Sequence, residues 1–588
     1  MSTNQELSRV FDQMAAALEL LGANPFRANS NERVARVLRD MTEDVRAFVA
    51  ADPETARRRL EELTGIGKGS AAKILEYVET GKLAEHEELM AKVPRGLFAV
   101  LEVPGLGPKA VKLMWDELGI TSLDELTARL ATDPQAVAAL PRMGMKKVES
   151  IRKGLAFSAH AHERTPLGRA LPLALRLRDE LGAVPGVKRV DYAGSLRRGR
   201  ESIGDLDFLA AGGDLGAAAE RFTTLPEVTE VLAHGDTKCS VRLAAEGVAI
   251  QADLRLVPAA AYGAALLYFT GSREHNVRLR EIAVRRGMRL NEYGLFQGTD
   301  ERPQDSGTTP VAAATEEEIY AALGLPYVPP ELREDRGELA GVPARLIEAG
   351  DVQAELHAHT TASDGKLSIA ELAAAARARG YHTLAVTDHS PSQVIAGGLT
   401  VERLLEHAEK VRAADAEVDG ITILAGAEVD VLPDGRLDYE DEVLARLDVV
   451  VASPHAALGQ DPKTATARLL KAIRHPLVHV LGHPTGRMIG RRGGLSPDMG
   501  ALFAAAARHD VALELNANWH RLDLRDVHVR GALEAGCKIA LDTDAHREAD
   551  FDMLVYGVLT ARRAGLEPAA CVTAWSAEKL HGWLRSKR

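Results

Sequence analysis

The fold of the central region is decided by residues 194–209, which read Gly194-Ser195-Leu196-Arg197-Arg198-Gly199-Arg200-Glu201-Ser202-Ile203-Gly204-Asp205-Leu206-Asp207-Phe208-Leu209. The segment ends in an apolar run typical of a strand. Alternate side chains of a strand project from one face, so Asp205 and Asp207 are expected to lie side by side. Asp253, in a second alternating run, is the best candidate for a third carboxylate. Together they predict a site for two divalent metals.

Other short β-rich runs surround this segment, and a helical stretch precedes them. The runs cover residues 190–194, 206–211, 240–243 and 249–257. This pattern predicts an α+β domain. An Asp-x-Asp tripeptide alone is usually a solvated strand edge, so the metal-site prediction depends on the whole 194–209 segment and on Asp253.

The N-terminal 160 residues have apolar residues at three- and four-residue spacing, which predicts helices. Short glycine turns separate the helices, notably Leu63-Thr64-Gly65-Ile66-Gly67-Lys68 and Val103-Pro104-Gly105-Leu106-Gly107-Pro108-Lys109. Such turns allow the backbone N–H groups to approach phosphates closely. Two of them before the α+β domain therefore predict DNA contacts without sequence preference.

Beyond residue 350, apolar runs alternate with alanine-rich helical stretches. The runs cover residues 383–387, 421–426, 449–453, 478–482, 511–515 and 539–542. The alternation predicts a barrel of parallel strands with outer helices. Metal-ligand residue types follow or end these runs, where a barrel would bring them to one face; they are His357, His359, Asp364, His389, Glu428, His455, His483, Asp544 and His546. Five further histidines lie off this pattern and are expected to be ordinary surface or core residues, namely His475, His479, His509, His520 and His528.

These patterns divide the 588 residues into several domains, as expected for a chain too long for one core. The proline- and acid-rich stretch 326–350 lacks apolar periodicity and is interpreted as a linker. The expected domains are two helical domains that each contain a glycine turn (1–80 and 81–160), the α+β domain (161–262), a further domain (263–325), the linker (326–350) and the barrel (351–588).

The composition agrees with a globular protein outside the membrane. Hydrophobic residues make up 46% of the chain, and no apolar run approaches the roughly 18 residues of a membrane span. Three unpaired cysteines and a polar N-terminus favour the cytoplasm. The formal net charge of −12 argues against a uniformly basic surface, so any nucleic-acid contact must depend on local sites and divalent cations.

The 194–209 segment resembles the nucleotidyltransferase signature of the DNA polymerase beta family, known as family X, in its Gly-Ser, Arg-Arg-Gly, Gly-Asp and Asp-x-Asp elements. The resemblance implies that residues 1–80 form a domain with a helix-hairpin-helix, residues 81–160 the fingers with a second one, residues 161–262 the palm and residues 263–325 the thumb. It implies that the palm holds Mg²⁺ or Mn²⁺ at Asp205, Asp207 and Asp253. It implies that a deoxynucleoside triphosphate contacts Gly194, Ser195, Arg198, Gly204, Tyr268, Phe269, Gly271, Asn276 and Arg280. Leu290-Asn291-Glu292-Tyr293-Gly294 resembles the thumb of that family. Gln251 and Arg273 depart from the family pattern, so fidelity does not carry over.

The C-terminal ligand pattern resembles the polymerase and histidinol phosphatase (PHP) superfamily, which implies a distorted barrel with three metals and phosphoesterase activity. The resemblance assigns His357, His359, Glu428 and Asp544 to one metal, Glu428, His455 and His483 to a second, and Asp364, His389 and His546 to a third. Mixed imidazole and carboxylate ligands suit Zn²⁺, Mn²⁺ or Fe²⁺. All nine expected positions are filled, so an active domain is expected.

The glycine turns resemble the helix-hairpin-helix elements of the same polymerases, which implies DNA contacts at Gly65, Gly67, Gly105 and Gly107, with Na⁺ or K⁺ at the turns. Lys73 matches the family position that forms a Schiff base with a 5′-deoxyribose phosphate. Gly69 replaces a basic residue nearby, and an exposed helix lysine is an equal alternative, so lyase activity is left open.

The function that the resemblance implies is gap filling in DNA repair, on gapped or nicked double-stranded DNA, by a cytoplasmic, nucleoid-associated monomer. The barrel would add a 3′–5′ exonuclease, with abasic-site processing left open. Two alternatives remain at this point: a small-molecule phosphatase fused to a DNA-binding arm, and a scaffold that binds DNA ends. The complete carboxylate set of the palm argues against the first, and twelve metal-ligand residues argue against the second.

Overall fold

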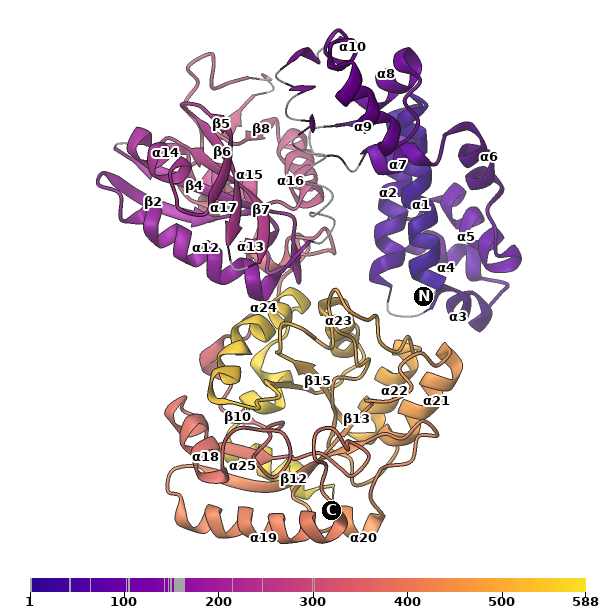
Figure 1. Ribbon diagram of the computed structural model, residues 1–588, viewed down its shortest axis with the longest axis vertical. Helices are drawn as coiled ribbons and strands as arrows, with labels where there is room; N and C mark the ends of the chain where they lie inside the picture. The colour runs from indigo at the N-terminus through magenta and orange to yellow at the C-terminus, as the bar shows by residue number, and fades with distance from the viewer. Residues whose placement is uncertain are drawn as a thin grey trace. The chain divides into compact units, whose positions relative to one another are not determined.

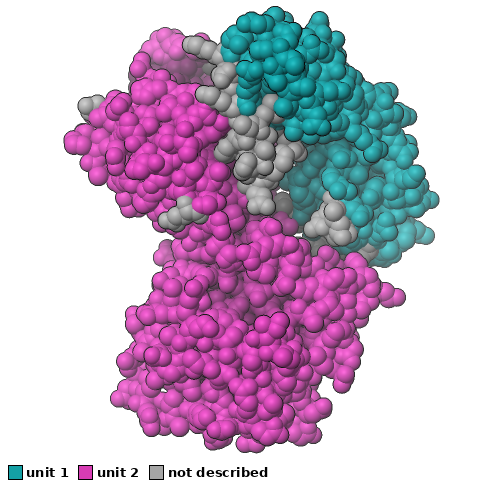
Figure 2. All heavy atoms as spheres, viewed as in Figure 1, with its two compact units in different colours: residues 1–163 teal, residues 164–588 magenta. Residues whose placement is uncertain are grey.

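The computed structural model describes residues 3–41, 44–63, 65–101, 103, 106–141, 143–145, 147–148, 151–152, 164–213, 215–245, 247–298, 300 and 302–587. The chain divides into two compact units, residues 1–163 and 164–588, which Figure 2 shows in different colours. Each unit has its own hydrophobic core.

The first unit is helical, as predicted. Its core packs apolar side chains such as Phe11, Met14, Ile74 and Val111, all fully buried. The helices of this unit are α1 (Thr3–Leu20), α2 (Pro25–Asp40), α3 (Val45–Ala51), α4 (Ala56–Glu62), α5 (Lys68–Thr80), α6 (Ala84–Lys92), α7 (Gly96–Leu101), α8 (Pro108–Leu118), α9 (Leu123–Thr132) and α10 (Pro134–Ala138). The glycine turns predicted from the sequence come directly before α5 and α8.

The palm is a five-stranded sheet in the order β2-β4-β7-β6-β5, and the predicted α+β domain is thereby confirmed. Strands β4 and β7 are parallel, and the other pairs are antiparallel. The palm elements are β1 (Thr165–Pro166), α12 (Leu167–Gly182), β2 (Val187–Tyr192), α13 (Gly194–Arg197), β3 (Ser202–Ile203), β4 (Asp205–Gly212), α14 (Leu215–Thr223), β5 (Val228–His234), β6 (Lys238–Ala245) and β7 (Val248–Leu256).

The thumb follows the palm and is built on α15 (Tyr262–Thr270), α16 (Arg273–Arg285), the hairpin of β8 (Met288–Asn291) and β9 (Gly294–Gln297), and α17 (Glu316–Ala322). The stretch 326–350, which we expected to be a linker without apolar periodicity, contributes side chains to the thumb core. Val328 is fully buried in the thumb core, and Leu332, Leu339 and Val342 pack against it. Arg333 is also fully buried. The apolar residues of this stretch are too few and irregular to show a period, which explains why the sequence pattern missed this packing.

The C-terminal domain has seven parallel strands in sequential order, β10 to β16, with helices outside them (Figure 1). A parallel bridge between Ala358 and Ala545 connects the two ends of the sheet and nearly closes it. The predicted parallel barrel is therefore confirmed. Its strands are β10 (Ala354–Glu355), β11 (Thr383–Val386), β12 (Thr422–Asp430), β13 (Val449–Ser453), β14 (Val480–Leu481), β15 (Ala512–Asn516) and β16 (Ile539–Asp542).

The helices of the barrel are α18 (Ile369–Ala378), α19 (Val401–Glu417), α20 (Asp441–Leu444), α21 (Pro462–Ile473), α22 (Met499–His509), α23 (Asp526–Glu534), α24 (Leu554–Ala564) and α25 (Ala577–Arg585). Among the helices of the described part of the chain, none is long and apolar enough to cross a membrane.

Buried ion pairs connect the palm, the 326–350 stretch and the barrel within the second unit. Glu334 lies 3.1 Å from Arg198 of the palm and 2.9 Å from Arg563 of α24. Arg563 also pairs with Asp526 of α23 at 2.9 Å. These charges hold the pKa of the Glu334 carboxyl well below its usual value, although burial opposes the shift. A buried carboxylate requires such paired charges, so the stretch 326–350 serves as a packed junction.

Candidate active sites

The palm carboxylates come together because β4 and β7 are parallel neighbours. Asp207 lies opposite Asp253 in the register, and Asp205 lies opposite Gln251. Gly194 approaches the same point with φ +62°, and a Cβ there would lie 2.3 Å from Oδ2 of Asp207. Only glycine allows this approach of the backbone. The three aspartates predicted from the sequence therefore form one cluster.

Charge crowding in this cluster is shown by the carboxyl pKa values. Burial, together with Asp205 and Asp253, raises the pKa of Asp207 to about 7. Desolvation and the Asp253 carboxylate also raise the pKa of Asp205, although its side chain reaches solvent. Lys238 pairs with Asp253 and offsets part of the negative charge. Bound divalent cations would relieve the repulsion between these carboxylates, and carboxylate oxygens are donors that fit Mg²⁺ or Mn²⁺.

The residues expected to contact the triphosphate are distributed around the cluster. Ser195 belongs to α13, and Gly204 is an exposed residue directly before β4. Arg198 is held by Glu334 and by a hydrogen bond that it donates to the Thr270 carbonyl. Because these partners occupy its guanidinium, Arg198 has fewer donors for a phosphate than the sequence suggested.

The residues expected around the sugar and base lie in α15, α16 and the turn between them. The rings of Tyr268 and Phe269 form an edge-to-face pair with centroids 5.1 Å apart, and Tyr268 is 38% exposed. Gly271 has φ +69° in the turn, and the Asn276 side chain donates to the Tyr268 carbonyl at 2.7 Å. Arg280 is exposed on α16.

Among the described glycines of the two turns in the first unit, Gly65 has the positive φ expected for close approach, whereas Gly67 and Gly107 have negative φ. Gly65 has φ +105°. Gly67 and Gly107 precede the first turns of α5 and α8, and a Cβ at either position would meet no heavy atom of the described residues within 4 Å. Gly105 lies outside the described residues. Lys73 is on α5, where its Nζ lies 2.6 Å from Glu85.

The nine barrel residues predicted as metal ligands all belong to groups whose ligand atoms lie within 4.8 Å of one another. The groups differ in detail from the expected sets. Two groups share Glu428, which joins His357 and His483 in one and His389 and His455 in the other. The remaining groups are His359 with Asp364, His389 and His546, and His357 with His359 and Asp544. His359 therefore lies between two groups, and Glu428 is placed to bridge.

The side chains of the barrel cluster have the properties expected of metal ligands. Buried side-chain atoms usually have hydrogen-bond partners. Both Glu428 carboxylate oxygens, both His483 ring nitrogens and Nε2 of His357 are buried without a hydrogen-bond partner among the described residues. His483 and Asp544 also have positive φ, at 21° and 56°, a strain typical of functional sites. Imidazole and carboxylate donors in this density fit Zn²⁺, Mn²⁺ or Fe²⁺.

A comparison with known proteins identifies the family. DNA polymerase/3′-5′ exonuclease PolX of Bacillus subtilis (strain 168) is 38% identical over 583 residues, which cover 99% of each chain. The chain belongs to the PolX family of DNA polymerases.

Family models match four parts of this PolX-family chain. They are a helix-hairpin-helix domain (residues 2–83), a SAM-like helix-hairpin-helix tandem (98–156), a DNA polymerase beta thumb (265–334) and a PHP domain (355–493). Shorter relatives include two probable phosphatases. The one from Shewanella sediminis is 30% identical over 33% of this chain and 77% of its own length. The one from Caldanaerobacter subterraneus is 26% identical over 40% of this chain and 91% of its own length. The full-length match is therefore to a polymerase, whereas the phosphatase likeness covers a minor part of the chain.

Two carboxylates that contact predicted ligands of the PHP domain were missed by the sequence patterns. Glu514 of β15 lies 2.6 Å from Nδ1 of His357 and accepts a hydrogen bond from the backbone N–H of His483. Asp430 of β12 contacts Nδ1 of His455. A carboxylate behind an imidazole fixes which ring nitrogen faces the metal. Asp430 ends β12 two residues after Glu428, and this position is a signal that could have found it. Glu514 lies in the middle of β15, so no strand-end signal pointed to it.

Proposed function

We propose that the chain is a DNA-directed DNA polymerase that fills short gaps, and that its PHP domain is a 3′–5′ exonuclease acting on the same DNA. The observation that carries the proposal is the presence of both clusters in one chain, Asp205, Asp207 and Asp253 on the palm sheet and nine ligand residues in the barrel. A phosphatase would not need the first cluster, and a scaffold would need neither.

In the palm, two divalent cations would be held by the three aspartates, one to lower the pKa of a primer 3′-hydroxyl and one to hold the triphosphate. Gly194 and Ser195 would supply backbone and hydroxyl donors for phosphate oxygens. Tyr268 and Phe269 form a rigid aromatic pair that would press against the sugar and exclude a 2′-hydroxyl. Asn276 and Arg280 would contact the incoming nucleotide and the template.

In the PHP domain, Zn²⁺, Mn²⁺ or Fe²⁺ would activate water and neutralise the phosphate charge. Glu428 would bridge two of the ions, and Glu514 and Asp430 would orient His357 and His455. The histidine pKa values divide into two groups. Although burial opposes the shift, Glu428 raises the pKa of His389 to about 10 and that of His455 to about 9, so metal binding would displace a proton from each ring. Burial, His546 and His389 lower the pKa of His359 to about 4, so that its ring is neutral and able to bind metal at neutral pH.

The expected partners are gapped or nicked double-stranded DNA and deoxynucleoside triphosphates. The helix-hairpin-helix turns at Gly65, Gly67, Gly105 and Gly107 would bind DNA phosphates with Na⁺ or K⁺. A DNA substrate implies work at the nucleoid, and we expect a monomer. Abasic-site incision by the PHP domain and lyase chemistry at Lys73 would extend the same repair role.

The test follows a 5′-labelled primer on one-nucleotide-gapped DNA with Mn²⁺, with and without deoxynucleotides. We compare the native chain with Asp205→Ala and His359→Ala. The primer should lengthen by the templated base unless Asp205 is lost, and should shorten without nucleotides unless His359 is lost. If neither reaction occurs, the proposal fails and the phosphatase or scaffold alternative must be taken up.

A further inference from the structure

Arg521 is a cation beside the PHP metal cluster with no assigned role. It lies in the loop between β15 and α23, and its Nε is 3.8 Å from Oδ2 of the ligand residue Asp544. This distance is too long for a hydrogen bond, and the same oxygen accepts one from Asn516 at 3.1 Å. The guanidinium therefore reaches the cluster without using its donors on Asp544.

The Arg521 side chain is 18% exposed, and its Nη1 nitrogen is buried without a hydrogen-bond partner among the described residues. A buried guanidinium donor without an acceptor is unfavourable, because it loses its hydration and gains no protein partner. Its position next to several divalent cations would add repulsion between like charges. Both costs disappear when an anion lies between the guanidinium and the metals, which makes the position suited to a bound phosphate.

The loop that carries Arg521 is held at both ends. The backbone N–H of Asn516 donates to the Asp523 carbonyl at 2.7 Å, and that of Arg521 donates to the Asn518 carbonyl at 2.7 Å. Leu522 is fully buried in the core cluster of the palm. The backbone that carries the guanidinium is therefore preorganised, and the loop needs little further ordering when a ligand binds.

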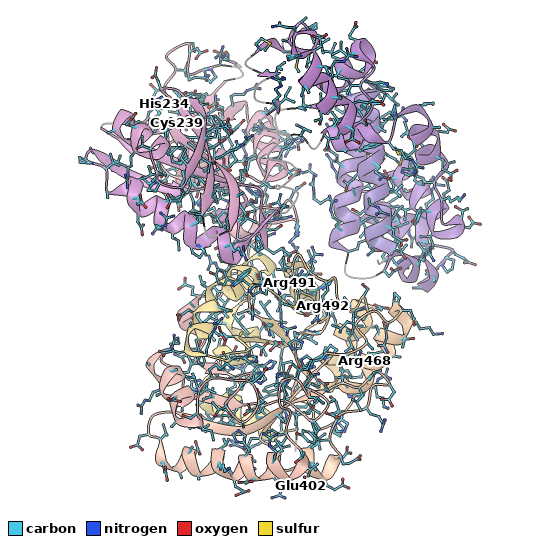
Figure 3. All side chains as sticks on the ribbon, in the orientation of Figure 1. His234, Cys239, Glu402, Arg468, Arg491 and Arg492 are labelled. Atoms are coloured by element: carbon cyan, nitrogen blue, oxygen red, sulfur yellow. The ribbon has the colours of Figure 1, made fainter. Side chains whose placement is uncertain are left out.

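Other arginines lie near Arg521 and His520 and make this part of the surface positive. Arg491 and Arg492, labelled in Figure 3, follow β14 and are exposed. Burial lowers the pKa of the Arg492 guanidinium, and the charge of Arg521 lowers it further. Burial also lowers the pKa of His520, and the charges of Arg491, Arg169 and Arg521 add to that shift. Positive charge at the rim would attract the phosphates of an approaching strand.

We propose that Arg521 binds a non-bridging oxygen of the phosphodiester that is cleaved in the PHP domain, and that Arg491 contacts an adjacent phosphate of the strand. The inference rests on the proposed exonuclease. In that hydrolysis the oxygen of water forms a bond to phosphorus, the bond to the 3′-oxygen of the preceding nucleotide breaks, and one proton passes from water to that oxygen. Arg521 neither gives nor takes a proton; its charge stabilises the negative phosphoryl oxygens as the new bond forms.

The experiment compares the native chain with Arg521→Ala, Arg521→Lys and Arg491→Ala on two substrates. One is a single-stranded oligonucleotide, and the other is thymidine 5′-monophosphate p-nitrophenyl ester, which contains one phosphodiester and no neighbouring phosphate. Metal content is measured by plasma emission, and thymidine 5′-monophosphate binding to the Mn²⁺-loaded variants is measured by calorimetry. Arg508→Ala, on the exposed end of α22, is the control for losing a surface arginine.

Arg521→Ala should keep the native metal content, lose about 100-fold in kcat/KM on both substrates and bind the monophosphate at least about 10-fold more weakly. Arg521→Lys should lie between it and the native chain, because lysine keeps the charge but loses the planar fork. Arg491→Ala should raise KM for the oligonucleotide alone, and Arg508→Ala should change nothing. The inference would be overturned if Arg521→Ala hydrolysed the ester as fast as the native chain, or if it lost metal in proportion to its loss of activity. An inactive native chain would overturn the proposed function and the inference with it.

Discussion

The palm and the PHP domain arrange metal-ligand residues in opposite ways. In the palm, Asp205 and Asp207 are two positions apart, and Asp253 lies opposite Asp207 on the next strand. In the PHP domain, the ligand residues extend from His357 to His546 and meet only because a barrel brings its strand ends together. A palm site of this kind depends on local register, whereas the PHP site depends on the whole domain.

The two sites also balance charge differently. The predicted ligands of the palm are all carboxylates, and burial and their mutual repulsion raise the pKa of Asp207 although Lys238 offsets part of the charge. The PHP domain intersperses imidazoles among its carboxylates, and burial of Glu428 is outweighed by His455, His357 and His389, which hold its pKa well below the usual value. Without metal, the crowded carboxylates of the palm therefore destabilise the folded chain, whereas the imidazoles of the PHP cluster partly neutralise its carboxylates.

The largest expected effect is a separation of the two activities. Asp253→Asn should reduce primer extension by about 1000-fold and leave excision unchanged, because only the palm loses a ligand. Glu428→Gln should reduce excision by a similar factor and leave extension unchanged. Both reactions are measured on the same gapped DNA in single-turnover conditions. Loss of both activities in either variant would show that the sites are not independent.

The next effect concerns the carboxylate behind His357. Glu514→Gln should weaken metal binding and excision by about 10–100-fold, because the amide no longer holds the imidazole in one tautomer. The measurement is metal affinity by competition with a chelator, together with kcat for excision. Asp441→Asn is the control, since Asp441 contacts the off-pattern His475 at the surface. Equal metal affinity in Glu514→Gln and the native chain would contradict the positioning role.

The sequence predicted the parts of this molecule that repeat a pattern. The strand containing Asp205 and Asp207 and the barrel follow from the alternation of residue types. The nine residues that we predict as metal ligands were found from their residue types near strand ends, and the structure brings them together. The ion pair of Arg198 does not follow from such a pattern, because its partner Glu334 comes 136 positions later in the chain. Glu514 was missed for the same reason, since its partner His357 is 157 positions away.

The third prediction tests the instability of the metal-free palm. The pKa of Asp207 is raised to about 7 in the folded state, so its contribution to stability is present at pH 4 and is lost as the pH rises toward 7. Asp207→Asn does not ionise, and should be more stable than the native chain at pH 8 by on the order of 2 kcal/mol, with little difference at pH 4. Thermal unfolding in chelator measures this difference. Mg²⁺ should remove most of it by stabilising the native chain alone. An Asn variant that is less stable at pH 8 would refute the account.

The smallest expected effect belongs to the ion pair of Lys73 and Glu85 in the first unit. Burial raises the pKa of Glu85, but Lys73 and Arg27 together outweigh burial, so the net shift is downward. The pair therefore contributes above about pH 4.5, and its contribution is lost as the pH falls. Lys73→Ala should lower the free energy of unfolding by about 0.5 kcal/mol at pH 7, and by less in about 1 M salt.

The same ion pair bears on the lyase chemistry left open for Lys73. A Schiff-base lysine must be a free amine, so Glu85→Gln should increase borohydride trapping of the chain on 5′-deoxyribose phosphate DNA. Absence of trapping in Glu85→Gln and in the native chain would leave Lys73 with a structural role only.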